Sequence, residues 1–180
     1  SSHELIIDPI ILKWSTFIAS TASVGIRTGY VRDIAIAKNE DVYCVGFYRD
    51  EYPTTPGVYQ PKSAGGKIDA TVFKVSADGS QLLFSTYIGG DGVDYGRSIK
   101  INSKNEIFIT GQTFSTNFPT TNGAVKRTLA GGNDVVAFKM SPDGKSLLWS
   151  TYIGGGYYED INYEFAAGME LTSSDEIIFS

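Results

Sequence analysis

The residues best able to bind a metal ion lie in the glycine-rich stretch 89–96, which reads GGDGVDYG. Asp91 and Asp94 stand three residues apart there, in a segment whose glycines predict a turn. Calcium takes several oxygen ligands, and closely spaced carboxylates in a turn supply some of them. The spacing differs from that of an EF-hand loop, so the alternative is that both aspartates cap and solvate the turn. Calcium is the one cofactor for which the sequence offers candidate ligands.

Two further carboxylates, Asp69 and Asp134, are 65 residues apart, and each precedes a predicted strand. Carboxyl groups about 5 to 10 Å apart can perform the acid and base steps of glycoside hydrolysis. Because the two positions are equivalent in a repeat, the sequence favours a structural role, in which each accepts backbone hydrogen bonds at the start of its own strand.

A cluster of tyrosines, Tyr157, Tyr158 and Tyr163, lies near Glu159 and Asp160. Exposed tyrosines beside carboxylates bind sugar or protein surfaces well, since the ring offers contact area and the hydroxyl a polar handle. The alternative is that these rings pack between repeats. The cluster is therefore the candidate ligand-binding segment.

The chain has one histidine, His3, and one cysteine, Cys44, which restricts its chemistry. A general base of the Ser-His-Asp type would have to be His3, close to the start of the chain, where positioning is poor. Cys44 stands in the apolar run VYCV and is expected to be a small buried hydrophobic residue. A zinc site of cysteines and histidines would need ligands from elsewhere. The sequence thus predicts no catalytic residue, and we expect a protein that is not an enzyme.

Composition excludes further classes. The 15 Lys and Arg against 20 Asp and Glu give a net charge of −5, which repels the phosphate backbone of nucleic acids. No stretch reaches the ~18 to 20 apolar residues of a membrane-spanning helix. With 13% aromatic residues, 20 glycines and only 19% charged residues, the composition favours β-structure with tight turns.

The elements that position these residues recur with a period of about 65 residues. The segment FSTYIGG at 84–90 returns as WSTYIGG at 149–155, and WSTFI at 14–18 is an earlier copy. The Pro-Thr-Thr at 53–55 returns at 119–121. Residues 31–46 match 96–111 and then 165–180. The shared register predicts copies of one structural unit.

Each copy reads as four short strands, placed in the second copy at 97–102, 106–111, 135–140 and 147–153. A tight polar link joins the first two strands into a predicted hairpin. The Ser-Pro-Asp-Gly at 141–144 predicts a turn closed by a left-handed glycine. The Ser-Thr pair of the fourth strand is expected to hydrogen-bond across strands. No segment shows sustained helical periodicity.

Four antiparallel strands with a Gly-Gly exit describe a blade of a β-propeller, so the predicted fold is an all-β, incomplete propeller. We expect residues 19–90 to form the first blade, 91–155 the second and 156–180 the start of a third. All belong to one propeller domain. Because closed propellers typically have 4 to 8 blades, further blades of a larger chain, or another protein, are expected to cover the open edges.

Taken in order, these motifs resemble the SBBP family of bacterial β-propeller repeats over nearly the whole chain. The family pattern runs roughly S-T-Y-L-G-G, an alternating strand, V-Y-V-T-G, F-P-T-T-x-G-A, D-A-F-V-x-K and x-D-G. Its matches here lie at 85–90 and 150–155, 42–46 and 107–111, 118–124, and 69–74 and 134–139. The resemblance implies a large secreted or surface-anchored bacterial protein, in some cases with adhesion modules or sorting domains for a secretion system. It also implies that residues 1–18 form a junction, of which 10–18 are the outer strand that closes the ring.

The sequence and the resemblance together predict a non-enzymatic scaffold, secreted or on the bacterial cell surface, that binds a protein or a glycan. Two alternatives stay open. One is a carbohydrate-active propeller enzyme whose site lies partly in other blades. The other is a segment of an exported substrate held by secretion machinery.

Overall fold

The computed structural model describes residues 15–16, 29–49, 51–154 and 168–179. Every regular element within these ranges is a β-strand, and the strands form two four-stranded antiparallel sheets and one two-stranded hairpin. The predicted all-β class is therefore confirmed for the described residues. None of them belongs to a helix that is long and apolar enough to cross a lipid bilayer.

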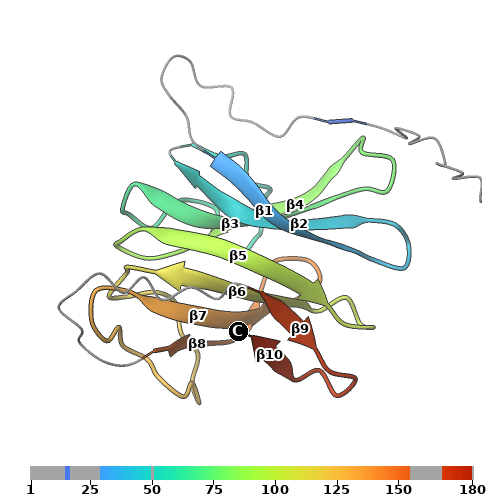
Figure 1. The fold of residues 1–180 in the computed structure, drawn as a ribbon. Coiled ribbons are helices and arrows are strands. Elements are labelled where there is room, and N and C mark those ends of the chain that lie inside the picture. Colours follow the sequence, from blue (N-terminus) through green and yellow to red (C-terminus); the bar gives the residue numbers. More distant parts are fainter. Residues whose placement is uncertain (1–14, 17–28, 50, 155–167, 180) are drawn as a thin grey trace, which may run out of the picture.

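Both four-stranded sheets follow the order of the sequence, so each is a meander of hairpins (Figure 1). The first sheet contains β1 (Gly29–Ile36), β2 (Val42–Arg49), β3 (Ile68–Val75) and β4 (Leu82–Ile88). The second sheet contains β5 (Asp94–Ile101), β6 (Ile107–Thr113), β7 (Asp134–Met140) and β8 (Leu147–Ile153), and the hairpin contains β9 (Met169–Leu171) and β10 (Ile177–Phe179). The four strands predicted for the second copy are all present, although β5 begins three residues earlier than expected.

The two sheets share their irregularities as well as their strands. A bulge between Val31 and Asp33 in β1 recurs between Gly96 and Ser98 in β5. A register shift at the end of β3 recurs at the end of β7. The turn that joins the first two strands of each copy carries a non-glycine residue with positive φ, namely Glu40, Asn105 and Asp175. Since bulges are built features of a fold, these coincidences identify the sheets as copies of one unit.

The tight turn between the third and fourth strands forms as predicted in both copies. Gly79 donates its amide to Ser76 O at 2.8 Å, and Gly144 donates to Ser141 O at 3.0 Å. Both glycines have φ near +70°, at 72° and 68°, in the left-handed region that glycine enters without steric cost. In each turn an aspartate at the position before glycine accepts a hydrogen bond from the serine hydroxyl at 2.6 Å.

The Ser-Thr pair of the fourth strand bonds differently from the prediction. The hydroxyl of Thr86 hydrogen-bonds the backbone of Gln60, and the hydroxyl of Thr151 hydrogen-bonds the backbone of Lys126. These side chains therefore hold the long connection between the second and third strands against the sheet edge, rather than bonding across strands. The backbone of β4 is occupied by β3 on one side only, so its other side is free to bind the connection.

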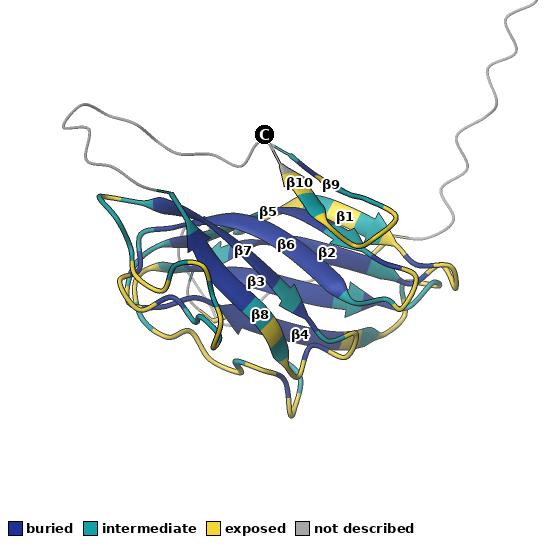
Figure 2. Cartoon of the chain, turned by 90° about the horizontal axis from the view of Figure 1, so that it is seen from below, coloured by how far each residue is buried: buried dark blue, intermediate teal, exposed yellow. Residues whose placement is uncertain are grey.

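The sheets stack face to face, and β5 packs against β1, β2 and β3 (Figure 1). The apolar core lies between them, and the central strands are buried while the loops are exposed (Figure 2). The first sheet contributes Ala37, Tyr43, Val45, Val58, Ala70, Val72, Phe84 and Ile88, and the second Ile99, Ile107, Ile109, Phe118, Val136, Phe138, Met140 and Tyr152. Burial of this aromatic and aliphatic surface is the main force that holds the sheets together.

The first strands of successive copies are linked by polar contacts. The Asp33 carboxylate in β1 accepts hydrogen bonds from Ser98 Oγ at 2.7 Å and from the amide of Ile99 at 2.9 Å, both in β5. In turn, Lys100 in β5 pairs with Glu170 in β9 at 3.1 Å. Each copy thus meets the next through its first strand.

Candidate functional site

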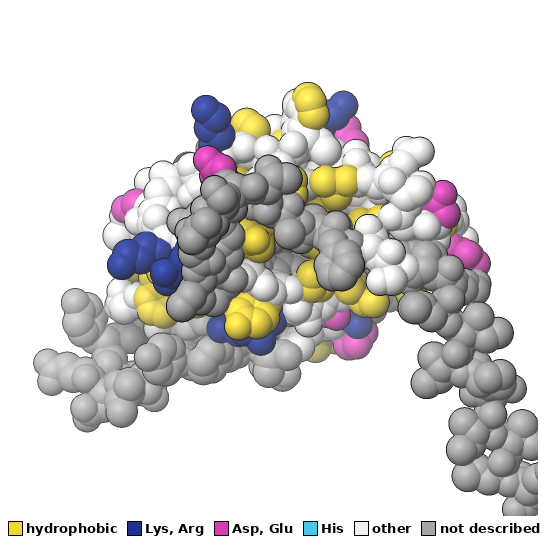
Figure 3. Space-filling view, turned by 90° about the horizontal axis from the view of Figure 1, so that it is seen from above, with side chains coloured by type: hydrophobic (Ala, Val, Ile, Leu, Met, Phe, Trp, Pro, Cys, Tyr) yellow, Lys and Arg dark blue, Asp and Glu magenta, His cyan; other side chains and the backbone are white. Residues whose placement is uncertain are grey.

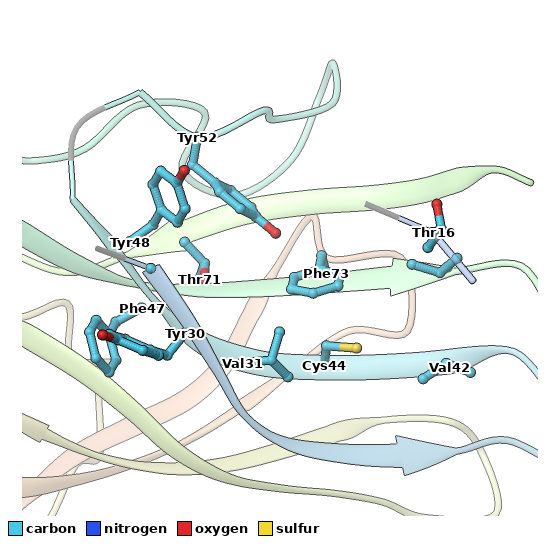
Figure 4. Close-up of a pocket in the computed structure, with 12 residues that line it drawn as sticks. Thr16, Tyr30, Val31, Val42, Cys44, Phe47, Tyr48, Tyr52, Thr71 and Phe73 are labelled. Atoms are coloured by element: carbon cyan, nitrogen blue, oxygen red, sulfur yellow. The ribbon is translucent and has the colours of Figure 1, made fainter. Parts of the chain in front are cut away.

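The outer face of the first sheet, on the side away from β5, carries an apolar hollow of about 230 Å³. We define the outer face by the clustered side chains of Cys44, Tyr52, Phe73, Val75 and Tyr87. Figure 3 shows hydrophobic side chains gathered on this side of the molecule, with charged side chains around them. In the close-up, Cys44 and Phe73 project from β2 and β3 toward the hollow, and Thr16 lies beside it (Figure 4).

Each residue of the outer face has an equivalent in the second sheet, about 65 positions later. The equivalents are Ile109, Phe118, Phe138, Met140 and Tyr152, and all five belong to the core between the sheets. The edge strand makes the same point, because Ile34 in β1 is 52% exposed whereas its equivalent Ile99 in β5 is fully buried. The outer face of the first sheet therefore corresponds to the face by which the second sheet packs on the first. Among the described residues, no sheet lies against this outer face.

The groups at the outer face are suited to packing and poorly suited to catalysis. Burial raises the pKa of the Cys44 thiol to about 12, so this side chain is not a thiolate at neutral pH. Burial likewise raises the pKa of the Tyr52 phenol. The amide of Tyr52 donates to the hydroxyl of Tyr87 at 2.6 Å, which ties the connecting loop to the sheet.

The second feature of interest is polar and lies between the sheets, where Asp69 of β3 and Asp94 of β5 are brought together. Asp69 is 1% exposed and Asp94 is 0% exposed. Both carboxylates converge on Gly89, since a Cβ at this residue would lie 2.5 Å from Asp69 Oδ1 and 2.6 Å from Asp94 Oδ2. Only glycine leaves room for both oxygens. We call this pair the inter-sheet acidic pair.

Hydrogen bonds and burial act in opposite directions on the inter-sheet acidic pair. Asp94 accepts bonds from the hydroxyls of Thr113 and Ser115 and from the amide of Gly90. Burial outweighs these bonds and, with the nearby Asp69 carboxylate, raises the pKa of Asp94 to about 6. Burial also raises the pKa of Asp69, whose Oδ2 accepts the amide of Ala64 at 3.0 Å.

In the second copy, the charge of the equivalent buried aspartate is compensated by a lysine. Asp134, the equivalent of Asp69, is fully buried and pairs with Lys126 Nζ at 3.0 Å. The Lys126 ammonium also donates to the carbonyl of Gly154 at 2.6 Å. In the first copy the position of Lys126 is taken by Gln60, because both residues bond the hydroxyl of the fourth-strand threonine through their backbone amides at 3.0 Å.

The two aspartates of the predicted calcium turn have separate surroundings. Asp91 lies at the exposed turn, where its carboxylate accepts bonds from the amide and hydroxyl of Thr116 at 2.8 and 2.6 Å. The Thr116 hydroxyl and amide lower the pKa of Asp91. Asp94 points into the interior instead. No group of three or more His, Cys, Asp or Glu side chains able to hold a metal ion occurs among the residues that the structure describes.

The remaining predicted residues divide between two outcomes. Asp69 is the second residue of β3 and Asp134 the first residue of β7, so they stand at the strand starts. Each accepts an amide from the preceding loop, as the structural interpretation expected. They do not form a pair with each other, since Asp69 faces Asp94 and Asp134 binds Lys126. Tyr157, Tyr158 and Tyr163, with Glu159, Asp160 and His3, lie outside the described residues, as does most of the predicted outer strand at 10–18.

Sequence reasoning overlooked the exchange of Gln60 for Lys126. The signal was available, because the two residues are 66 positions apart, the same offset as Pro53 and Pro119.

No protein-family model matches this chain, and no curated protein matches its sequence. The fold, the apolar outer face and the inter-sheet acidic pair define an all-β protein built from repeated four-stranded sheets.

Proposed function

We propose that this chain is part of a β-propeller of ~65-residue blades that acts as a non-enzymatic scaffold outside the bacterial cell and binds a protein or a glycan. The observation that carries the proposal is the contrast between Ile34 and Ile99. The two residues are equivalent in their sheets, yet the first is 52% exposed and the second fully buried beneath a neighbouring sheet. Because the first sheet has an apolar packing surface with no sheet against it among the described residues, we expect another copy of the unit to pack there.

The partner of the outer face is inferred from the contact between the two described sheets. The second sheet packs on Tyr43, Val45, Val72, Phe84 and Ile88 of the first, which form the opposite face of the same unit. Contact between unlike faces is heterologous, so each added unit leaves one face open until a ring closes. The surface expected on the outer face is therefore another repeat, from the same longer chain or from another protein.

A non-enzymatic role is supported by the state of the buried polar groups. The inter-sheet acidic pair is shielded by both sheets, and Asp134 is held by Lys126. The carbohydrate-active alternative needs two carboxyl groups that reach a substrate from opposite sides of one bond. Polysaccharide turnover by the complete protein, lost on substitution of Asp69 or Asp134, would favour that alternative over a scaffold. The secretion-substrate alternative predicts unrelated polypeptides on the outer face.

Cysteine labelling of the complete native protein tests the propeller. Ile34→Cys places a thiol on the edge strand of the outer face, Ile99→Cys places one at the equivalent position between the described sheets, and Val125→Cys places one at a site that is 94% exposed. A covering repeat protects the thiols at 34 and 99 alike from a maleimide, while the thiol at 125 reacts at the rate of a free thiol. Rapid labelling at position 34 with protection at 99 would show an open face and refute the propeller.

A further inference from the structure

The first strand of each sheet contains a β-bulge, and an arginine is the extra residue of both bulges. The register of β1 shifts between Val31 and Asp33, so Arg32 is the residue inserted opposite β2. The equivalent shift in β5 has Arg97 as its extra residue. A bulge re-aims a side chain out of the regular alternation of its strand, and bulges are frequent beside functional sites. We call Arg32 and Arg97 the bulge arginines.

Both bulge arginines lie over aromatic rings of their own sheet. Arg32 Cζ is 5.5 Å from the centre of the Tyr30 ring and 5.1 Å from the centre of the Phe47 ring. Arg97 Cζ is 5.0 Å from the centre of the Tyr95 ring. The rings of Tyr30 and Phe47 lie together (Figure 4), and Phe47 meets Tyr95 edge to face with 4.7 Å between ring centres. One aromatic stack thus connects the two arginines across the contact between the sheets.

The positive charge of Arg32 is not compensated by a carboxylate. Its side chain is exposed, and no ion pair among the described residues includes it. The neighbouring Asp33 carboxylate is turned to β5, where it accepts the Ser98 hydroxyl and the Ile99 amide. Burial lowers the pKa of Arg97, and the positive charge of Arg32 lowers it further. An anion in contact with both guanidinium groups would relieve this repulsion.

The two copies differ in what they offer the bulge arginine besides its tyrosine. In the second copy, Arg97 Nη2 donates a hydrogen bond to Gln112 Oε1 at 2.9 Å, so this guanidinium already binds a neutral oxygen. In the first copy, Phe47 takes the place of Gln112 and offers Arg32 a ring instead of an amide oxygen. The planar guanidinium fork binds a carboxylate through two parallel hydrogen bonds. Arg32 is therefore the arginine better placed to bind an external carboxylate.

We propose that the bulge arginines form a binding site for a glycan that carries carboxylates, such as a chain of uronic acids. The inference rests on the proposed binding function and deepens it by naming the class of ligand. Each arginine lies beside a tyrosine of its own copy, and Tyr30 is 55% exposed. The tyrosine ring offers contact area to a sugar, while the guanidinium binds the sugar carboxylate. Two equivalent arginine–tyrosine pairs in consecutive copies match a polymer that repeats one acidic sugar.

Arginine modification of the complete native protein tests the site. Phenylglyoxal reacts with accessible guanidinium groups, and mass spectrometry of the digested protein reports the modification of each arginine separately. We expect oligogalacturonate at tenfold excess over its Kd to slow the modification of Arg32 about tenfold. The methyl ester of the same oligomer has the same sugars without the charge and should not protect Arg32. The exposed Arg127 is the internal control and should react at the same rate with and without the oligomer.

Substitutions separate recognition of the ligand from packing. In Arg97→Gln the concentration of oligogalacturonate that half-protects Arg32 should rise about tenfold, as for the loss of a hydrogen bond to a charged group. Arg97→Lys keeps the charge without the planar fork and should also bind more weakly than the unmodified protein. Arg127→Gln is the matched control, because it removes the same charge from another exposed position and should leave the half-protecting concentration unchanged. Near-ultraviolet circular dichroism establishes that each variant is folded.

Three results would overturn the site. If Arg32 reacts at the same rate with and without oligogalacturonate, no acidic glycan binds there. If Arg32 is unreactive before any ligand is added, it is covered in the complete protein and serves packing alone. If a polyglutamate of equal charge protects Arg32 as well as oligogalacturonate does, the site binds carboxylates of peptides and the glycan assignment fails. None of these results bears on the labelling pattern of positions 34, 99 and 125, so failure of the glycan site and failure of the propeller are distinguishable.

Discussion

Substitution of Tyr152 by phenylalanine removes one oxygen from the centre of the packed core. The Tyr152 hydroxyl accepts the amide of Phe118 at 2.8 Å and donates to the carbonyl of Ser115 at 2.8 Å, while the side chain is almost fully buried. Phenylalanine keeps the ring and its edge contact with Phe118. The change therefore strands two buried backbone groups and alters little else.

The expected loss follows from those two groups. A buried donor or acceptor left without its partner costs about 1 to 3 kcal/mol, so the loss of two such partners in Tyr152→Phe should lower the free energy of unfolding by about 2 to 6 kcal/mol. Urea unfolding monitored by tryptophan fluorescence measures the loss. Tyr30→Phe is the control, since Tyr30 is exposed, and should change stability by less than about 0.5 kcal/mol. A Tyr152→Phe protein as stable as the control would refute the assignment of both hydrogen bonds as buried and necessary.

Three further outcomes are expected. Lys126→Gln deprives the buried Asp134 of its cation and should cost about 3 kcal/mol in urea unfolding, since breaking a buried pair leaves an uncompensated charge; an unchanged midpoint would contradict the pairing. The raised pKa of Asp94 means that the folded state holds a proton that the unfolded state has released, so stability should fall by about 3 kcal/mol as pH rises from about 4 to 6. The same titration of Asp94→Asn should be flatter, and an equal slope would exclude Asp94 as the source. Finally, Gly96→Ala places a Cβ 2.7 Å from Gly46 O and should lower Tm by several degrees, whereas the exposed equivalent Val31→Ala should not, as differential scanning calorimetry can establish.

Strands and turns were predictable because alternating side chains and turn-forming residues, which act over a few positions, determine them. The alternation in 97–102 produced β5, and the Ser-Pro-Asp-Gly turn formed with a left-handed Gly144, as expected. The start of β5 at Asp94 was missed, because residues 94–96 pair with β6 through contacts that no alternation of side chains reveals. The fourth-strand hydroxyls were assigned the wrong partners for a similar reason. They bond a loop some 25 residues away, and the loop path is set by packing.

The candidate site was predictable only in its parts. Asp69, Asp94 and Asp134 were all singled out as acidic residues with possible roles, yet the pairing considered for Asp94 was with its sequence neighbour Asp91. In the structure its carboxyl neighbour is Asp69, 25 positions earlier and on the other sheet. Spacing along the chain favours Asp91 as the partner of Asp94. The two side chains nevertheless point in different directions, since Asp94 is buried and Asp91 lies at the exposed turn.

The sequence alone determined the unit and its period, because hydrogen bonding within a meander needs only alternation, turn residues and a repeated register. Tertiary structure alone decided which carboxylates meet, which aspartate has an ammonium, and which apolar face stays open. Those outcomes depend on the offset and orientation with which one sheet stacks on another. Packing of many side chains sets that offset jointly, and no short segment of sequence encodes it.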